Sequence, residues 1–336
     1  MLTILDHIPA GLLETSARDL HRILPGPTLI LLPGRRAPSL FVSVLLHGNE
    51  DTGLYAVQAL LRRTQELPRA LSVFIGNVSA ARFGTRFLPH QPDYNRIWPG
   101  ADAPDSPEAR MLSEIVDIMA ARRVFVSVDI HNNTGLNPHY GCINRLDHRF
   151  LQLARLFSRT VVYFTRPQGV QSMAFAELCP AVTLECGKPG QARALQHAVD
   201  YLHACLNLSD LPAHPVAAHD IDLFHTVAVV KVSDTVTFSF SNPAADILFD
   251  DDLDQLNFRE LPAGTALGTI ATDASVGLVA TSEQGADVTD EYFENVGGRL
   301  TLKKAAMPSM LTLDENIIRQ DCLCYLMERL TQNAVV

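Results

Sequence analysis

Short apolar runs alternate with helix-like segments between about residues 39 and 208. The runs, rich in Val, Ile, Leu and Phe, are LFVSVLLH (40–47), LSVFIGN (71–77), FVSVDIH (125–131), TVVYF (160–164) and AVTLE (181–185). Continuous apolar runs of this length are typical of strands that are buried on both faces. The segments between them predict helices over 52–63, 107–122, 147–158 and 191–206. This alternation predicts an α/β fold in which a mixed, mostly parallel sheet carries helices on both faces.

The pattern changes near residues 208–220, where Pro, Ala and His replace the periodic segments. Short β-like runs follow: HTVAVVKV (225–232), TVTFSF (235–240), LGTIAT (267–272), GLVAT (277–281) and RLTLKK (299–304). We therefore predict an α/β domain over 1–212 and a smaller β-rich domain over 213–336. Apolar residues recur at helical spacing in the segment 315–330, ENIIRQDCLCYLMERL, so we expect a terminal amphipathic helix there.

Charge and composition disfavour several classes of function. The chain of 336 residues has a formal net charge of -10 and no long Lys/Arg run, which disfavours binding to nucleic acid or to an anionic membrane. It lacks a stretch of about 20 apolar residues that would span a membrane, and its N-terminus does not resemble a signal peptide. The six cysteines have neither the spacing of a disulfide framework nor that of a CxxC zinc site. We expect a cytoplasmic protein with reduced thiols, and a homo-oligomer is left open.

His47 and His131 each end a predicted strand, and Glu50 follows the first of these strands. His47 and Glu50 lie in VLLHGNED, and His131 lies in VDIHNNTG. The three-residue offset of HxxE points both side chains the same way in a turn or in the first turn of a helix. Two imidazoles and one carboxylate can hold a zinc ion with one position left open, which is typical of catalytic zinc. Alternatively, His47 and Glu50 cap a helix and His131 is a hydrogen-bonded core residue.

Two further carboxylates belong to the same strand ends. Glu185 ends the run AVTLE, and ligands bind at the carboxyl ends of strands in sheets of this kind. An ionised carboxylate is rarely buried without a partner, so Glu185 is a candidate acid and base, or else it pairs with Lys188. Asp129 precedes His131 by two residues and can orient that imidazole.

The segment TRFLPHQPDYNRIWPG (85–100) carries Arg86, Asn95 and Arg96. Arginine suits recognition of a carboxylate because its planar fork can bind two oxygens. A second arginine near a metal can stabilise negative charge that develops during a reaction. On composition alone, the segment can also be a polar loop with ordinary surface arginines.

These segments together resemble the succinylglutamate desuccinylase/aspartoacylase family of the zinc carboxypeptidase superfamily. The resemblance runs through HGNE, GNVSAARFGTRF, DYNRIWPG, DIHNNTG and TLECGKPG, in that order, over roughly residues 40–205. It implies a zinc-carboxypeptidase-like α/β domain followed by a smaller β-rich domain that shapes the pocket entrance. It also implies that one Zn²⁺ is bound by His47, Glu50 and His131.

The resemblance implies roles for the remaining polar residues. Glu185 is similar in position to the family's general base and acid, and Arg86 to the arginine that polarises the scissile carbonyl. Asn95 and Arg96 are similar to the pair that binds the free carboxylate of the substrate. The sequence also departs from the family. The stretch between Arg86 and Asn95 is longer than in close aspartoacylase relatives. The segment GVQSMAFAELCP lacks the Tyr and Arg that aspartoacylases carry, which disfavours N-acetylaspartate as the substrate.

The sequence therefore predicts a zinc-dependent amidohydrolase that cleaves the amide bond of an N-acyl amino acid or a similar small carboxylate. One alternative is a carboxypeptidase-like metallopeptidase that acts on short peptides, because it would use the same metal and the same Glu185. A second alternative is a zinc-binding protein without catalytic activity.

Overall fold

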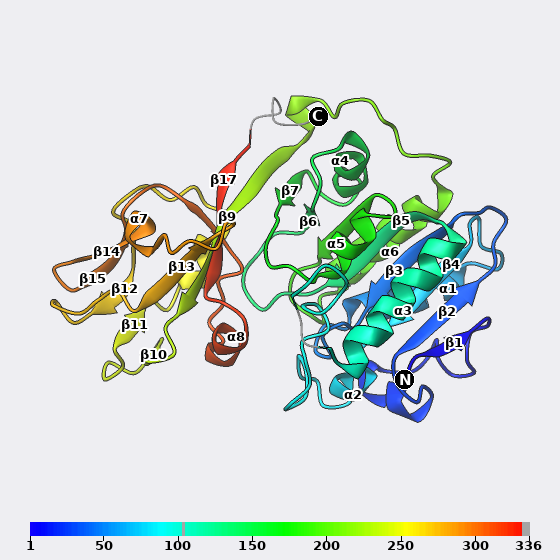
Figure 1. The fold of residues 1–336 in the computed structure, drawn as a ribbon, viewed down its shortest axis with the longest axis horizontal. Helices are drawn as coiled ribbons and strands as arrows, with labels where there is room; N and C mark the ends of the chain where they lie inside the picture. Colours follow the sequence, from blue (N-terminus) through cyan, green and yellow to red (C-terminus); the bar gives the residue numbers. More distant parts are fainter. Residues whose placement is uncertain (103–104, 331–336) are drawn as a thin grey trace.

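One large sheet forms the frame of the structure, a computed structural model that describes residues 1–102 and 105–330 (Figure 1). It has 12 strands in the order β1-β2-β4-β3-β5-β8-β6-β7-β9-β17-β16, and β13 pairs with β9 beside this path. The strands of the first half are β1 (Thr3–Leu5), β2 (Thr28–Leu32), β3 (Ser39–Val44), β4 (Leu71–Ile75), β5 (Val124–His131), β6 (Tyr140–Ile143), β7 (Thr160–Tyr163) and β8 (Ala181–Glu185). The later strands are β9 (Asp222–Val232), β13 (Leu278–Ser282), β16 (Met307–Ser309) and β17 (Cys324–Arg329).

The centre of this sheet is parallel and apolar. The neighbouring strands β4, β3, β5 and β8 all run parallel, and every residue of β3, β4 and β8 is buried. Antiparallel pairs join β2 to β4 and β6 to β8, so the sheet is mixed. Burial on both faces explains why these segments read as continuous apolar runs. The predicted fold class is confirmed.

Helices cover both faces of the sheet. They are α1 (Thr52–Arg63), α2 (Val78–Ala81), α3 (Pro107–Arg122), α4 (His148–Arg155), α5 (Gln171–Ala176), α6 (Ala192–Asn207), α7 (Thr289–Tyr292) and α8 (Glu315–Gln320), with 3-10 turns at Ala17–Arg22, Ala218–Asp220 and Leu253–Leu256. Gly53 of α1 lies against Val44 of β3, whereas Phe175 of α5 stacks on Phe41 of β3 with ring centroids 4.2 Å apart. Residues 41 and 44 point to opposite faces of a strand, so α1 and α5 cover opposite faces. Among the described residues, no helix combines the length and apolar character that a membrane crossing needs.

The four helices predicted from the sequence are present. The helices α1 and α3 have the predicted bounds. The helix α4 lies within the predicted range, and α6 is shifted by one residue toward the C-terminus. Local capping explains the starts of α3 and α4: Ser106 accepts a hydrogen bond from the backbone N–H of Ala109, and Asp147 does the same for Arg149. The six cysteines are all buried and unbridged, as the sequence predicts.

A second sheet lies beyond the large one. Its order is β10-β11-β12-β15-β14, with β10 (Phe238–Ser239), β11 (Ile247–Phe249), β12 (Ala266–Ile270), β14 (Phe293–Val296) and β15 (Arg299–Leu302). Figure 1 shows β9 and β17 running from the large sheet toward this smaller one. Because β9, β13, β16 and β17 follow residue 212 and yet belong to the large sheet, the predicted division into 1–212 and 213–336 stays a prediction.

The predicted terminal helix over 315–330 is wrong in its second half. The chain forms the short helix α8 and then the strand β17, which pairs with β9 on one side and β16 on the other. Spacing in a short apolar segment does not distinguish a helix from a buried strand. The strand is favoured here because it forms hydrogen bonds with backbone N–H and C=O groups of β9 that a helix would leave unpaired.

Gly48, in the loop after β3, is expected to tolerate no side chain. A Cβ atom there would lie 2.2 Å from the backbone N of Ala81 in α2, and Gly48 donates its own N–H to the backbone O of Arg86 at 3.0 Å. We predict that Gly48→Ala lowers the free energy of unfolding by about 1–3 kcal/mol, because overpacking of a backbone contact forces the two segments apart. Urea denaturation measures this loss. Gly26→Ala is the control, since nothing lies within 4 Å of a Cβ at that position. Equal effects of the two substitutions would contradict the prediction.

Candidate metal and catalytic site

The loop between β3 and α1 carries the HxxE motif. The strand β3 ends at Val44, so the prediction that His47 ends a strand is wrong by a few residues. Leu45 has a φ of 55°, which turns the chain away from the strand direction, and the backbone N–H of Glu50 donates to the carbonyl of His47 at 3.2 Å. This turn brings the two side chains to one side, and both are buried, with 3% and 6% exposure.

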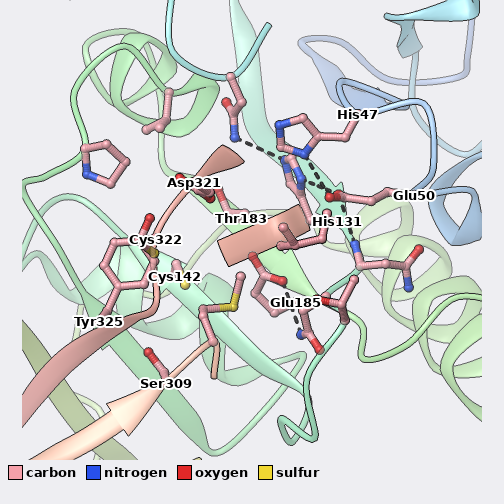
Figure 2. Close-up of a pocket in the computed structure, with 18 of the residues that line it drawn as sticks. His47, Glu50, His131, Cys142, Thr183, Glu185, Ser309, Asp321, Cys322 and Tyr325 are labelled. Atoms are coloured by element: carbon pink, nitrogen blue, oxygen red, sulfur yellow. Dashed lines mark hydrogen bonds and ion pairs between the residues drawn. The ribbon is translucent and has the colours of Figure 1, made fainter. Parts of the chain in front are cut away.

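Glu50 joins the two histidines. One carboxylate oxygen, Oε1, lies 2.8 Å from His47 Nδ1, and the other, Oε2, lies 2.7 Å from His131 Nδ1 at the end of β5 (Figure 2). One candidate ligand atom from each of the three residues lies within 4.8 Å of the others. Separate structural roles for the two histidines would not require a shared carboxylate. The arrangement therefore fits one metal ion better than helix capping combined with a core histidine.

The far nitrogens of both imidazoles also contact carboxylates. His47 Nε2 lies 2.9 Å from Asp93 Oδ1, and His131 Nε2 lies 2.7 Å from Asp129 Oδ2. The hydroxyl of Ser43 donates to Asp129 Oδ1 at 2.6 Å and holds that carboxylate in place. Metal-binding histidines commonly use their second nitrogen in this way, which fixes the ring orientation and leaves the nearer nitrogen free for the ion. The donor set of two imidazoles and one carboxylate suits zinc.

Glu185 stands beside this cluster, and no Lys or Arg of the described residues forms an ion pair with it. It ends β8, and the parallel pairing of β5 with β8 sets it opposite His131. The side-chain hydrogen bond that it accepts within the described residues is long, 3.4 Å from Asn133 Nδ2 to Glu185 Oε2. Burial raises the pKa of Glu185 to about 7, although the nearby His131 acts in the opposite direction. The alternative partner Lys188 lies instead 3.9 Å from Asp254.

Arg86 lies next to Glu50 with most of its guanidinium engaged. Its Nε and Nη2 donate to Asp93 Oδ2 at 3.1 and 2.9 Å, and Nη2 lies 3.3 Å from Asp321 Oδ2. Its Nη1 lies 3.9 Å from Glu50 Oε1 and makes no hydrogen bond within the described parts of the chain. The Arg86 side chain is 8% exposed, so the surface-loop alternative does not hold for it.

Asn95 and Arg96 complete the predicted set. Asn95 Nδ2 lies 3.3 Å from His131 Nε2, and Asn95 Oδ1 accepts from the backbone N–H of Gln171 at 2.9 Å. Arg96 donates from Nη2 to Asp321 Oδ1 at 2.7 Å and from Nη1 to the backbone O of Asn95 at 2.9 Å. All seven predicted site residues line one pocket. Arg96 is thus already paired with the carboxylate of Asp321.

Sequence reasoning missed two residues of this site. Asp93 stands two positions before Asn95 in DYNRIWPG, so its place in that motif was an available signal. Asp321 is separated from Arg96 by 225 positions and had no local signal. It belongs to the part of the pocket wall that follows residue 212, together with Ser309, Met310, Ile317, Cys322 and Tyr325. Figure 2 shows Asp321, Cys322 and Tyr325 on the pocket that also holds the cluster of His47, Glu50 and His131.

Solved structures share this fold. Succinylglutamate desuccinylase from Chromobacterium violaceum is 21% identical, with a TM-score of 0.52 over 82% of this chain and 87% of that one. The product-bound ectoine utilization protein from Ruegeria pomeroyi is 15% identical, with a TM-score of 0.59 over 90% and 88%. Murine aminoacylase 3 is 15% identical, with a TM-score of 0.56 over 88% and 97%. At these identities the likeness shows the fold alone.

A comparison with curated protein sequences gives no significant match. The family model of the succinylglutamate desuccinylase/aspartoacylase catalytic domain matches residues 36–208, which is just over half of the chain. This range contains the predicted metal ligands, Glu185 and the three residues of the 85–100 segment. The chain therefore belongs to the succinylglutamate desuccinylase/aspartoacylase family of amidohydrolases, which remove acyl groups from amino acids.

Proposed function

We propose that this protein is a zinc-dependent hydrolase that cleaves the amide bond of an N-acyl amino acid. One observation carries the proposal: Glu50 contacts both histidines through their Nδ1 atoms, and Glu185 stands opposite His131 with a raised pKa. Perturbed acids next to a candidate metal centre in a pocket are typical of catalytic sites.

We assign the metal site to His47, Glu50 and His131, with one zinc ion. These three residues leave room in the coordination sphere, as catalytic zinc sites do, whereas structural sites are closed. Zinc bound there supplies a Lewis acid and lowers the pKa of water to about 7. Asp93 and Asp129 hold the two rings by their far nitrogens.

Glu185 and Arg86 carry the proposed chemistry. A carboxylate with a pKa of about 7 accepts a proton from the attacking water and then donates it to the departing nitrogen, since it can exist in both forms at neutral pH. The free Nη1 of Arg86 is available to the carbonyl oxygen of the substrate, where negative charge develops. Removal of the acyl group then leaves a free amine and a free acid.

Asn95 and Arg96 form the proposed binding site for the amino acid part of the substrate. Asn95 accepts a hydrogen bond from the backbone N–H of Gln171, and its Nδ2 lies 3.3 Å from His131 Nε2, so this site adjoins the metal cluster. Arg96 lies next to it, and its Nη1 and Nη2 donate to the backbone O of Asn95 and to Asp321 Oδ1. Val162 and Phe164 add apolar wall to the same pocket, which suits a small organic substrate.

The first prediction concerns the metal. Zinc is expected to bind the purified protein one to one and to raise its unfolding free energy by about 2.7 kcal/mol at a concentration 100 times the Kd. His131→Ala is expected to abolish this binding, and Asp129→Asn to weaken it about 10–100-fold. Titration calorimetry and thermal unfolding with and without a chelator measure both effects. His139→Ala is the control, because His139 stacks on His197 away from the cluster. Unchanged zinc binding by His131→Ala would contradict the assignment.

The second prediction concerns activity. The zinc-loaded protein is expected to release amino acids from members of a panel of N-acyl amino acids, and Glu185→Gln is expected to lower kcat by about 10²–10⁴-fold while zinc binding persists. Amine release followed with a fluorogenic reagent measures this. A variant that keeps the full wild-type rate would rule out Glu185 as the proton carrier. Faster cleavage of short peptides than of N-acyl amino acids would favour the metallopeptidase alternative.

The third prediction concerns pH. The folded metal-free protein holds the proton of Glu185 up to about pH 7, whereas the unfolded chain releases it near 4.5. Stability is therefore lost as the pH rises between these values, and the ionised carboxylate costs the folded state up to about 3 kcal/mol above pH 7. Glu185→Gln is expected to stabilise the metal-free protein above pH 7 and to have little effect below pH 4.5. Zinc favours the ionised form, so the gain shrinks in the loaded protein. Urea denaturation of the wild type and of Glu185→Gln across this pH range measures the difference. Equal unfolding free energies of the two proteins above pH 7 would contradict the prediction.

A further inference from the structure

Asp321 bridges two arginines of the pocket. Its Oδ1 accepts a hydrogen bond from Arg96 Nη2 at 2.7 Å, and its Oδ2 lies 3.3 Å from Arg86 Nη2. Asp93 accepts two further hydrogen bonds from Arg86. Each of the two guanidinium groups is thus already matched by a carboxylate of the chain. The arginines therefore offer a substrate carboxylate no unmatched positive charge, and such a carboxylate would lie close to that of Asp321.

Solvent does little to screen this interaction. The Asp321 side chain is 19% exposed, and the side chains of Arg86 and Arg96 are 8% and 26% exposed. Charges in such partly buried places interact much more strongly than charges on an open surface. Like charges brought together there cost several kcal/mol in complexes between proteins. The electrostatic interaction of the Asp321 carboxylate with a bound substrate is therefore strong enough to affect which substrates bind.

Asp321 is also held firmly in place. It follows α8, and its backbone N–H donates to the carbonyl of Ile317 at 3.0 Å. The strand β17 begins shortly after Asp321 and pairs with β9 on one side and with β16 on the other. Its backbone is therefore fixed between α8 and β17, and its carboxylate leaves the arginines only by a change of side-chain rotamer. A substrate carboxylate must compete with Asp321 or bind elsewhere.

A neutral amide meets no such conflict. A carboxylate has about four lone-pair sites on its two oxygens, and within the described residues Asp321 accepts one hydrogen bond on each oxygen. It can still accept a hydrogen bond from an N–H group, whereas a second carboxylate has no proton to offer. The same pocket position therefore favours an amide over a free acid.

We propose that Asp321 is a specificity-determining residue that disfavours a free carboxylate on the amino acid part of the substrate and favours a blocked, amide-bearing carboxyl group there. The inference rests on the proposed deacylase function. The favoured substrates are N-acyl amino acid amides, of which the enzyme removes the acyl group. Asp321 takes no part in the chemical step.

The test compares matched substrates. The best acyl group from the panel is placed on leucine and on leucinamide, and kcat/KM is measured for both with the zinc-loaded wild type and with Asp321→Asn. The wild type is expected to prefer the amide. Asp321→Asn keeps the shape, removes the charge and is expected to shift the ratio toward the acid by about tenfold or more, mainly through a lower KM for the acid.

Glu260→Gln is the matched control. It also removes one negative charge, but Glu260 pairs with the exposed Arg329 and does not line the pocket. Its ratio of amide to acid is expected to equal that of the wild type. A shift as large as that of Asp321→Asn would assign the effect to net charge and overturn the inference.

Other outcomes also decide the question. If the wild type prefers the free acid, the inference is wrong, and Arg166 on the same pocket wall becomes the carboxylate site to examine. If Asp321→Asn slows both substrates in the same proportion, Asp321 only positions the arginines. Binding of N-acetyl-L-leucine and N-acetyl-L-leucinamide to zinc-loaded Glu185→Gln, measured by calorimetry, gives the same comparison without turnover. If every member of the panel fails both as the free acid and as the amide, the proposed function is rejected, and the binding ratio still tests Asp321.

Discussion

The contact of one buried carboxylate with two imidazoles is the interaction on which the rest of the site depends. Glu50 contacts His47 within the turn after β3, and it contacts His131 at the end of the neighbouring strand β5. A buried charge is costly unless it is paired, so neither the loop after β3 nor the end of β5 can move independently. Asp93 and Asp129 contact the far nitrogens of the two rings and restrict the ring orientations.

The parallel sheet supplies the remaining chemistry by register. The strands β3, β5 and β8 run the same way, so the residues that follow them or end them gather at one edge. The pairing of β5 with β8 sets Glu185 opposite His131. Its burial in this place explains both the raised pKa and the proposed role in proton transfer. A rigid apolar sheet therefore positions groups that are themselves polar and costly to bury.

The last part of the chain contributes a different property. The residues proposed for metal binding and proton transfer come from the first 212 residues, whereas Asp321, Cys322 and Tyr325 come from the segment around β17. This segment forms a strand, and the pairing of β17 with β9 and β16 anchors the turn that carries Asp321. We infer that it tunes the choice of substrate.

Local patterns determined much of this protein. The bounds of α1 and α3, the strand β8 and the two halves of the metal motif follow from apolar runs, caps and short spacings, all of which are set by neighbouring residues. Asp93 also lay within reach of such reasoning. The tertiary structure alone decided that residues 324–329 form a strand and that Asp321 contacts Arg86 and Arg96. Both depend on contacts between distant segments, and side-chain spacing within one segment carries no information about a partner more than 200 residues away.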